Sequence, residues 1–171
     1  MYDISVQSGD WPALDQLETI LARAFAACRD HLKGEPRLSR EISVVFSSDR
    51  EIADLNQAWR GIDKPTNVLS FPQDEAGQSA RLEMDYPLGD IVLAAETVAR
   101  EAKVAGIPLE HHIQHLFVHG VLHLLGYDHD VDDKAEAMES LEINILATLG
   151  VANPYPDLDP SSAGKTEQVL S

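Results

Sequence analysis

Hydrophobic residues recur along this chain at two spacings, one typical of helices and the other of buried strands. From Leu14 to Leu32 the apolar positions follow helical spacing, which predicts a first helix. From Ile42 to Phe46 the residues are largely apolar and β-branched, and the two serines that follow end a predicted strand. Shorter runs of the same kind predict three more strands, at Ile4 to Gln7, Asn67 to Phe71 and Ile91 to Leu93.

Four further helices follow from start signals and apolar spacing. Ser48 and Glu51 have the spacing of a capping box, so we expect a helix that starts there and runs through Trp59. Pro72 directly follows the third predicted strand and places it at a sheet edge, because proline cannot donate to a neighbouring strand. Together the elements predict an α+β fold, a small mixed four-stranded sheet packed with about five helices. The remaining helices are expected at Ala94 to Ala105, from Pro108 onward and at Asp133 to Leu149.

Length and composition favour a single domain. The chain has 171 residues, of which 44% are hydrophobic, enough for one core. We expect this domain over residues 1–152, with a long polar loop from Asp74 to Pro87, and a disordered tail over residues 153–171. No charged leader opens the sequence, and no apolar run approaches the roughly 20 residues of a membrane span. A cytoplasmic location without membrane attachment is therefore expected.

The histidines are concentrated in one stretch, six of the seven lying between His111 and His129. His119 and His123 are four residues apart, so both rings can reach one point from a helix. Gly126 allows that helix to end in a left-handed turn, which can bring His129 back towards the first two. Apolar residues fill the rest of the stretch, so we expect this helix in the core, where imidazoles need partners. We interpret His119, His123 and His129 as ligands of one metal ion.

Three imidazoles without cysteine are typical of a catalytic zinc site, because they leave a fourth tetrahedral position open. We expect one Zn²⁺ per chain, although copper, nickel and iron also accept imidazole. His115 could pair with His119 instead, but that pairing leaves His123 unused, so we place His115 behind the ligands. Asp128 is expected to orient a ligand, and the other acidic residues of the last helix to be solvated. Two first-turn histidines are also expected to be solvated, His111 and His112.

The histidine spacing also matches the metzincin peptidase pattern H-E-x-x-H-x-x-G-x-x-H at every position but one. Gly120 stands where those peptidases carry the glutamate that acts as general base, so peptide hydrolysis lacks its expected base. Met138 could be proposed for a Met-turn, but its helical surroundings predict a core residue. Cys28 is the only cysteine, so it forms no internal disulfide and is expected to be buried in the first helix.

Charge argues against a nucleic-acid enzyme, because the formal net charge is −16. The charge is unevenly distributed, however. The stretch from Asp128 to Glu142 carries seven acidic residues against one lysine, whereas Arg60 to Pro72 carries Arg60 and Lys64 against Asp63. A bound dication would add positive charge near the histidines.

Three segments resemble the YbeY family of bacterial rRNA maturation factors over about residues 40 to 150. They are H-G-x-L-H-L-x-G-Y-D-H from His119 to His129, R-G-I-D-K-P-T-N-V-L-S-F-P from Arg60 to Pro72, and G-D-I-V from Gly89 to Val92. The resemblance implies a zinc-dependent endoribonuclease that acts on rRNA of the small ribosomal subunit, in 16S rRNA 3′-end maturation and ribosome quality control. Ribosomal proteins are possible partners.

The resemblance also implies roles for individual residues. It places the zinc ligands at His119, His123 and His129, and a functionally important arginine at Arg60, so Arg60 and His123 are the expected catalytic residues. The guanidinium of Arg60 would suit a phosphate, although Arg60 could also simply end a surface helix. Phe71 could stack on an RNA base or be a core residue. The expected substrate-binding residues are Arg60, Lys64, Ser70 and Phe71.

Two other functions remain open from the sequence. One is a zinc hydrolase of another bond, peptide included. The other is a ribosome-assembly protein that binds RNA and keeps its zinc for structure.

Overall fold

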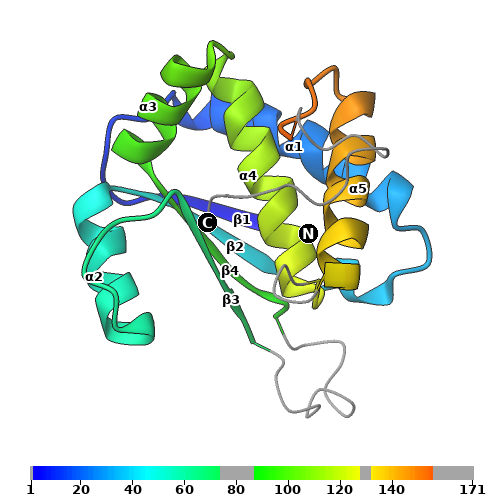
Figure 1. Ribbon diagram of the computed structural model, residues 1–171, viewed down its shortest axis with the longest axis horizontal. Helices are drawn as coiled ribbons and strands as arrows, with labels where there is room; N and C mark the ends of the chain where they lie inside the picture. The colour runs from blue at the N-terminus through cyan, green and yellow to red at the C-terminus, as the bar shows by residue number, and fades with distance from the viewer. Residues whose placement is uncertain (1, 74–86, 128–131, 156–171) are drawn as a thin grey trace.

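A computed structural model describes residues 2–73, 87–127 and 132–155, and in them one four-stranded sheet is packed with helices on both faces (Figure 1). The strands are β1 (Tyr2–Val6), β2 (Ile42–Ser47), β3 (Val68–Pro72) and β4 (Gly89–Ala94). The helices are α1 (Leu14–His31), α2 (Asp49–Arg60), α3 (Ala95–Ala105), α4 (Leu109–Leu124) and α5 (Asp132–Thr148), with a short 3₁₀ helix at Pro36–Ser39. The predicted α+β fold is confirmed, and the predicted elements agree with the observed ones to within a few residues.

The sheet is mixed, with strand order β1-β2-β4-β3. The first three of these strands are parallel, and β3 runs antiparallel to β4 at the edge, as Pro72 predicted. Gly89 begins β4 opposite Pro72. A Cβ at Gly89 would lie 2.5 Å from the carbonyl oxygen of Phe71 and 2.6 Å from Cδ2 of Leu124, so only glycine lets these segments meet.

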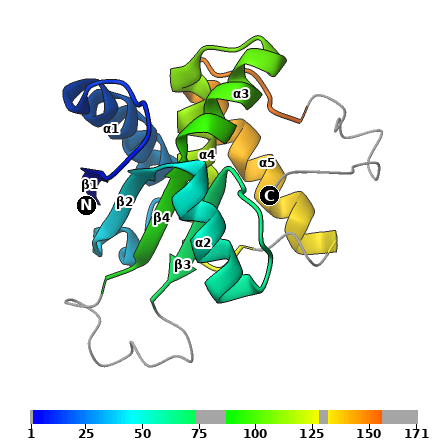
Figure 2. The same ribbon diagram turned by 90° about the vertical axis from the view of Figure 1, so that its left-hand side faces the viewer.

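The main core lies between one face of the sheet and the helices α1, α4 and α5 (Figure 2). Helix α4 is central to it, because almost every residue from His112 to Leu124 is buried. Cys28 and Met138 both belong to this core, as predicted. The expectation that the histidine helix lies in the core is therefore confirmed.

A smaller core on the other face of the sheet lies beneath α2. It joins Ile52 of that helix to Leu69 of β3 and Val92 of β4. Helices α2 and α4 thus cover opposite faces of β3 and β4 (Figures 1 and 2).

The start of α2 confirms half of the predicted capping box. The hydroxyl of Ser48 accepts a hydrogen bond from the amide of Glu51 at 3.3 Å. The carboxylate of Glu51, however, accepts from the hydroxyls of Ser47 and of Ser8, the latter at 3.0 Å. Glu51 therefore fastens α2 to the end of β2 and to the segment after β1, a tertiary role that the local pattern did not predict.

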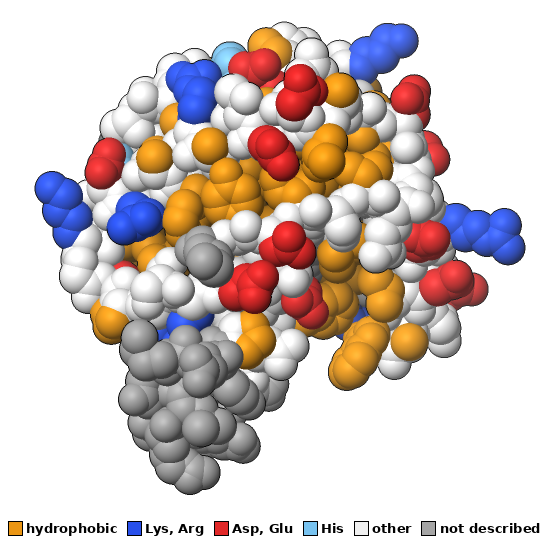
Figure 3. All heavy atoms as spheres, turned by 180° about the vertical axis from the view of Figure 1, so that it is seen from behind, with side chains coloured by type: hydrophobic (Ala, Val, Ile, Leu, Met, Phe, Trp, Pro, Cys, Tyr) orange, Lys and Arg blue, Asp and Glu red, His pale blue; other side chains and the backbone are white. Residues whose placement is uncertain are grey.

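The face opposite to that of Figure 1 carries a broad band of hydrophobic side chains (Figure 3). Among the exposed large hydrophobic residues, Val6 and Leu14 come from β1 and α1, the elements on that side of the molecule. In the described part of the chain, no helix combines the length and the apolar character that a membrane crossing requires.

Candidate functional site

His119 and His123 lie one turn apart on the same face of α4, as their spacing predicted. Their ring centroids are 4.6 Å apart and the ring planes make an angle of 76°. His119 is buried, and His123 is partly exposed at the end of the helix. Two imidazoles at this separation can present nitrogens to one ion.

Helix α4 ends at the glycine that the sequence singled out. Gly126 has φ 99°, and its amide donates a hydrogen bond to the carbonyl of His123 at 2.9 Å. The amide of Tyr127 donates to the carbonyl of Leu122 at 3.0 Å. These bonds form a left-handed helix end of the expected kind. His129 and Asp128 lie outside the described residues, so the return of His129 to the other two histidines stays a prediction.

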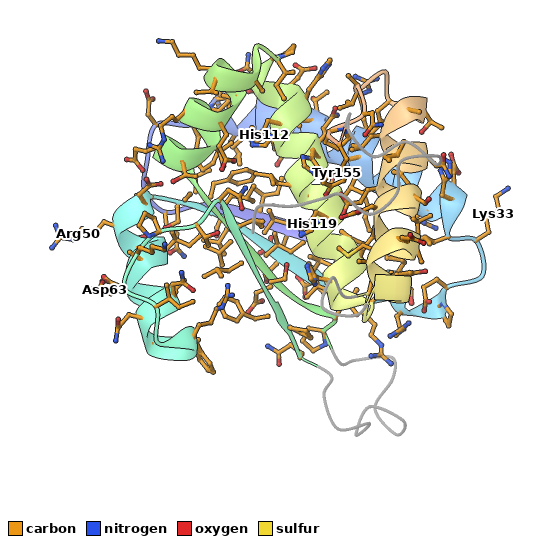
Figure 4. The ribbon with its side chains drawn as sticks, viewed as in Figure 1. Lys33, Arg50, Asp63, His112, His119 and Tyr155 are labelled. Carbon is orange, nitrogen blue, oxygen red and sulfur yellow. The ribbon has the colours of Figure 1, made fainter. Side chains whose placement is uncertain are left out.

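A buried carboxylate that the sequence analysis missed lies directly behind His119. Glu142 of α5 has an exposed fraction of 0%, and its Oε2 accepts a hydrogen bond from Nδ1 of His119 at 2.6 Å. Its Oε1 accepts from the hydroxyl of Tyr155 at 2.6 Å and lies 3.4 Å from Nε2 of His115. Two imidazoles of α4 and a phenol from the segment after α5 therefore share one carboxylate. Figure 4 labels His119 and Tyr155, which come from these two parts of the chain.

The surroundings of this cluster fix its protonation. Burial by itself would raise the pKa of Glu142, but the hydrogen bonds from His115 and His119 outweigh it and hold the pKa well below its usual range. Burial lowers the pKa of His115, which favours a neutral ring. Burial and then the charge of Glu142 raise the pKa of Tyr155, so its phenol keeps the proton that it donates.

The expectation that the acidic residues of the last helix are solvated is therefore wrong for Glu142. It shares the inner face of α5 with Met138, four residues before it, and Ile145, three residues after it, and both are buried. An acidic residue in the apolar stripe of a helix was the available signal. It was obscured because the acidic run as a whole predicted a solvated face.

His112 is a second correction, because it is buried and not solvated. Its Nε2 lies 2.8 Å from Oε1 of Glu101, and the same oxygen accepts from the side-chain amide of Asn67 at 2.9 Å. The packing of α3 against α4 closes over this ring, which spacing along α4 could not reveal. His115 was expected behind the ligands, and its place beside Glu142 and Tyr155 is consistent with that position.

Gly120 of α4 packs closely against the sheet. A Cβ at this position would lie 2.9 Å from Cδ1 of Ile91 and 3.1 Å from its Cγ1 and Cγ2. The position that carries the general base in metzincins therefore faces the central strand β4 and has no room for a side chain. Ser70 pairs with Ile91 across β3 and β4, so it belongs to this same face of the sheet.

Arg60 and Lys64 lie on the other side of β3 from the histidines, at the end of α2 and in the segment that follows. Both are exposed, and the side-chain amide of Asn56 donates to the carbonyl of Lys64 at 2.9 Å, which fastens this segment to the helix. Among the described residues no carboxylate forms an ion pair with Arg60. The structure thus brings His115, His119 and His123 together and does not place Arg60 in contact with them.

Phe71 faces α2 and not the histidines. It pairs with Asp90 on the second face of the sheet and packs against the smaller core. Trp59, which was expected only as a residue of the α2 helix, has an exposed fraction of 70%, and its ring centroid is 5.9 Å from that of Phe71. Trp59 thus presents an exposed indole next to Arg60, whereas Phe71 is half-buried.

The fold and the site together define a class of protein, a small α+β enzyme with paired histidines on a buried helix. The endoribonuclease YbeY family model matches residues 4–150 of this chain. Two curated endoribonucleases YbeY are close relatives, one from Rhizobium meliloti (strain 1021) and one from Rhodopseudomonas palustris (strain BisA53). The first is 48% identical over 163 residues, covering 92% of this chain and 95% of the relative. The second is 46% identical over 159 residues, covering 92% and 91%.

This chain therefore belongs to the endoribonuclease YbeY family, as its three sequence segments indicated. A solved structure is also similar, the solution structure of TM1509 from Thermotoga maritima. It aligns with a TM-score of 0.53 and 25% sequence identity, over 94% of this chain and 98% of that one. Membership in the family makes the protein an endoribonuclease, and hence a hydrolase that acts on RNA.

Proposed function

We propose that this protein is a zinc-dependent, cytoplasmic endoribonuclease that cuts single-stranded regions of rRNA in 16S 3′-end maturation and in ribosome quality control. The family supplies the cleavage of RNA. The observation that supports the metal is the hydrogen bond between Nδ1 of His119 and the buried Glu142, on a helix that also carries His123. Imidazoles that hold a metal typically donate their other ring nitrogen to such a carboxylate.

The donor set suits one zinc ion, held by His119, His123 and His129. The described residues contain no group of three histidine, cysteine or acidic side chains placed to hold a metal, and the third proposed ligand, His129, lies outside them. When bound, zinc would polarise a phosphodiester oxygen and lower the pKa of a water molecule to about 7. His123 is the ligand on the exposed side of the pair, next to the position where substrate would enter.

The chain itself supplies the contacts to RNA. Arg60 presents a planar guanidinium that can bind a phosphate through two hydrogen bonds, and Lys64 adds a second cation nearby. The net charge of the chain is −16, which repels RNA, but these two residues are exposed and place positive charge where RNA can bind. Ser70 would contact the RNA on the face of β3 that lies towards the histidines. For base stacking we propose Trp59 with support from Phe71, because Phe71 is turned towards α2.

Gly120 disfavours the peptidase alternative on steric grounds. A glutamate at this position would have to enter the contact with Ile91 before it could act as a base. Zinc held by three histidines would itself help to generate the nucleophile, because it would lower the pKa of a water molecule, so cleavage of RNA would not depend on a carboxylate at this position.

The test compares wild-type protein with His123→Ala on structured RNA, single-stranded RNA and peptide substrates, each with and without chelator, beside metal analysis of the purified protein. We expect RNA cleavage that is lost with chelator and in His123→Ala, and we expect one zinc per chain. Mapping of 16S 3′ ends in depleted cells tests the biological role. Cleavage of the peptide would instead support a zinc hydrolase of another bond. RNA binding that persists in His123→Ala, when the wild type cleaves no RNA, would support a ribosome-assembly protein with structural zinc.

Arg60→Lys tests the phosphate contact separately. It retains the charge but loses the fork of donors, so cleavage should fall while the zinc content stays at the wild-type value. Arg50→Lys is the matched control, an exposed arginine in the first turn of the same helix (Figure 4). Normal turnover in Arg60→Lys would remove this residue from the mechanism.

A further inference from the structure

Glu142 is an unusual residue for its surroundings. Among the described acidic residues it alone is buried, and the neighbouring core residues Met138 and Ile145 are completely apolar. Burial of a carboxylate is strongly unfavourable unless partners compensate for the lost water. The fold retains this charge, so its contacts indicate what it does.

Those contacts act on His119 in a defined way. Oε1 of Glu142 accepts from the hydroxyl of Tyr155, and Oε2 lies 2.6 Å from Nδ1 of His119. With the carboxylate as the acceptor at both oxygens, this contact places the proton of His119 on Nδ1. In a neutral imidazole the lone pair is then on Nε2. The carboxylate therefore selects one of two tautomers and at the same time fixes the orientation of the ring.

Tyr155 fixes the carboxylate in turn. It lies 13 residues after Glu142, past the end of α5 and the turn at Gly150, and its hydroxyl donates to Oε1 at 2.6 Å. Its ring meets the ring of His115 edge-on, with centroids 5.8 Å apart. Packing therefore continues past residue 152, where the sequence predicted the domain to end; the single-domain division and the disordered tail remain predictions.

We propose that Glu142 and Tyr155 are positioning residues that hold His119 in the Nδ1-protonated tautomer, with Nε2 presented to the metal. The proposal builds on the zinc site of the proposed function, but the selection of the tautomer by Glu142 belongs to the metal-free chain. Neither residue touches RNA in this arrangement. Both act through His119, and Tyr155 acts only through Glu142.

The first experiment reads the tautomer directly in metal-free protein. Nitrogen-15 NMR of the imidazole, at a pH where the ring is neutral, should show His119 protonated at Nδ1 in the wild type. Glu142→Leu removes the acceptor and should give a mixture of both tautomers. Glu136→Gln, an exposed acid on the same helix, is the control and should match the wild type. Protonation at Nε2 in the wild type, or an unchanged tautomer in Glu142→Leu, would overturn the proposal.

The second experiment measures zinc affinity by competition with a chromophoric chelator. Loss of a carboxylate behind a ligating histidine typically weakens metal binding about 10- to 100-fold, and we expect that loss for Glu142→Gln. Tyr155→Phe should weaken binding less, because Glu142 stays in place. The double variant should be no weaker than Glu142→Gln, because Tyr155 acts through the same carboxylate. Additive losses, or a Tyr155→Phe protein with wild-type affinity, would refute the role of Tyr155.

The two experiments also separate this proposal from the proposed function. If the protein binds zinc but cleaves no RNA, the nuclease proposal fails and the tautomer result stands. If RNA is cleaved normally while His119 shows the opposite tautomer, the positioning role fails alone. Thermal unfolding of each variant identifies one that has lost its fold, and Glu142→Met, which is close to glutamate in size and lacks a carboxylate or amide acceptor, then replaces Glu142→Leu.

Discussion

Replacement of Gly120 by alanine should destabilise the protein although alanine favours helices. In an unobstructed helix this change stabilises by about 1 kcal/mol. Here the new Cβ would lie 2.9 Å from Cδ1 of Ile91 and 3.1 Å from two further carbons of the same side chain. Overpacking of a core contact costs about 1 to 3 kcal/mol, so we expect a net loss of about 1 kcal/mol.

A double-mutant cycle with Ile91→Val isolates the contact. Valine lacks Cδ1, the atom nearest to the new Cβ, so Gly120→Ala should cost about 1 kcal/mol less in that background. The measurement is urea unfolding of metal-free protein, followed by circular dichroism, so that zinc binding does not add to the free energy. Gly120→Glu extends the series, since it adds an unpaired carboxylate to the same contact and should cost several kcal/mol.

A Gly120→Ala protein that is about 1 kcal/mol more stable than the wild type would refute this prediction. So would additive effects of the two substitutions on the free energy of unfolding, because the destabilisation would then not come from the contact with Ile91. Either result would mean that α4 does not rest on β4 at Gly120, and the steric argument against a peptidase would go with it.

Three further predictions concern other parts of the molecule. Burial raises the pKa of Cys28 to about 12, so the native protein should not react with a thiol reagent at neutral pH, and the rate should rise to that of a free thiol when denaturant unfolds the chain. Trp59→Ala should weaken binding of single-stranded RNA by about 1 to 3 kcal/mol in a fluorescence titration, whereas Val104→Ala, at another exposed apolar residue, should leave it unchanged; equal affinities would exclude stacking on the indole. Burial opposes ionisation of Glu101, but the hydrogen bonds from His112 and from the side-chain amide of Asn67 outweigh burial and lower the pKa of Glu101. The stability that this carboxylate contributes should therefore be present above about pH 4.3 and be lost below it. Unfolding midpoints of Glu101→Gln and wild type should therefore converge on acidification, and a constant difference would contradict this.

The elements of the fold were predictable because each has a local cause. Periodicity gave the helices, and the β-branched run from Ile42 to Phe46 gave a strand whose observed bounds are Ile42–Ser47. Pro72 gave the edge position of β3, and Gly126 gave the end of α4. What local pattern could not give is the order of the strands, because pairing joins segments far apart in the chain.

The site was predictable where its residues share one helix and not where they come from several. The proximity of His119 and His123 was predicted from spacing alone, because a separation of four residues on a helix fixes their relative position, and their role as ligands stays a prediction. Glu142 and His112 were misjudged, because their burial depends on how α5 and α3 pack against α4. For Phe71 the sequence allowed either stacking on an RNA base or a place in the core. The strand register, which local pattern does not give, determines the face of the sheet that it occupies.

The cluster around Glu142 can form only late in the synthesis of the chain. His119 and its carboxylate partner are 23 residues apart, and Tyr155 follows 13 residues later. During synthesis from the N-terminus, the sheet and α4 are available for packing before α5 and the segment after it have been made. Competence to hold a metal in the proposed orientation is therefore among the last properties that a newly made chain acquires, and a chain released before residue 155 would contain the ligand helix without the groups that align it.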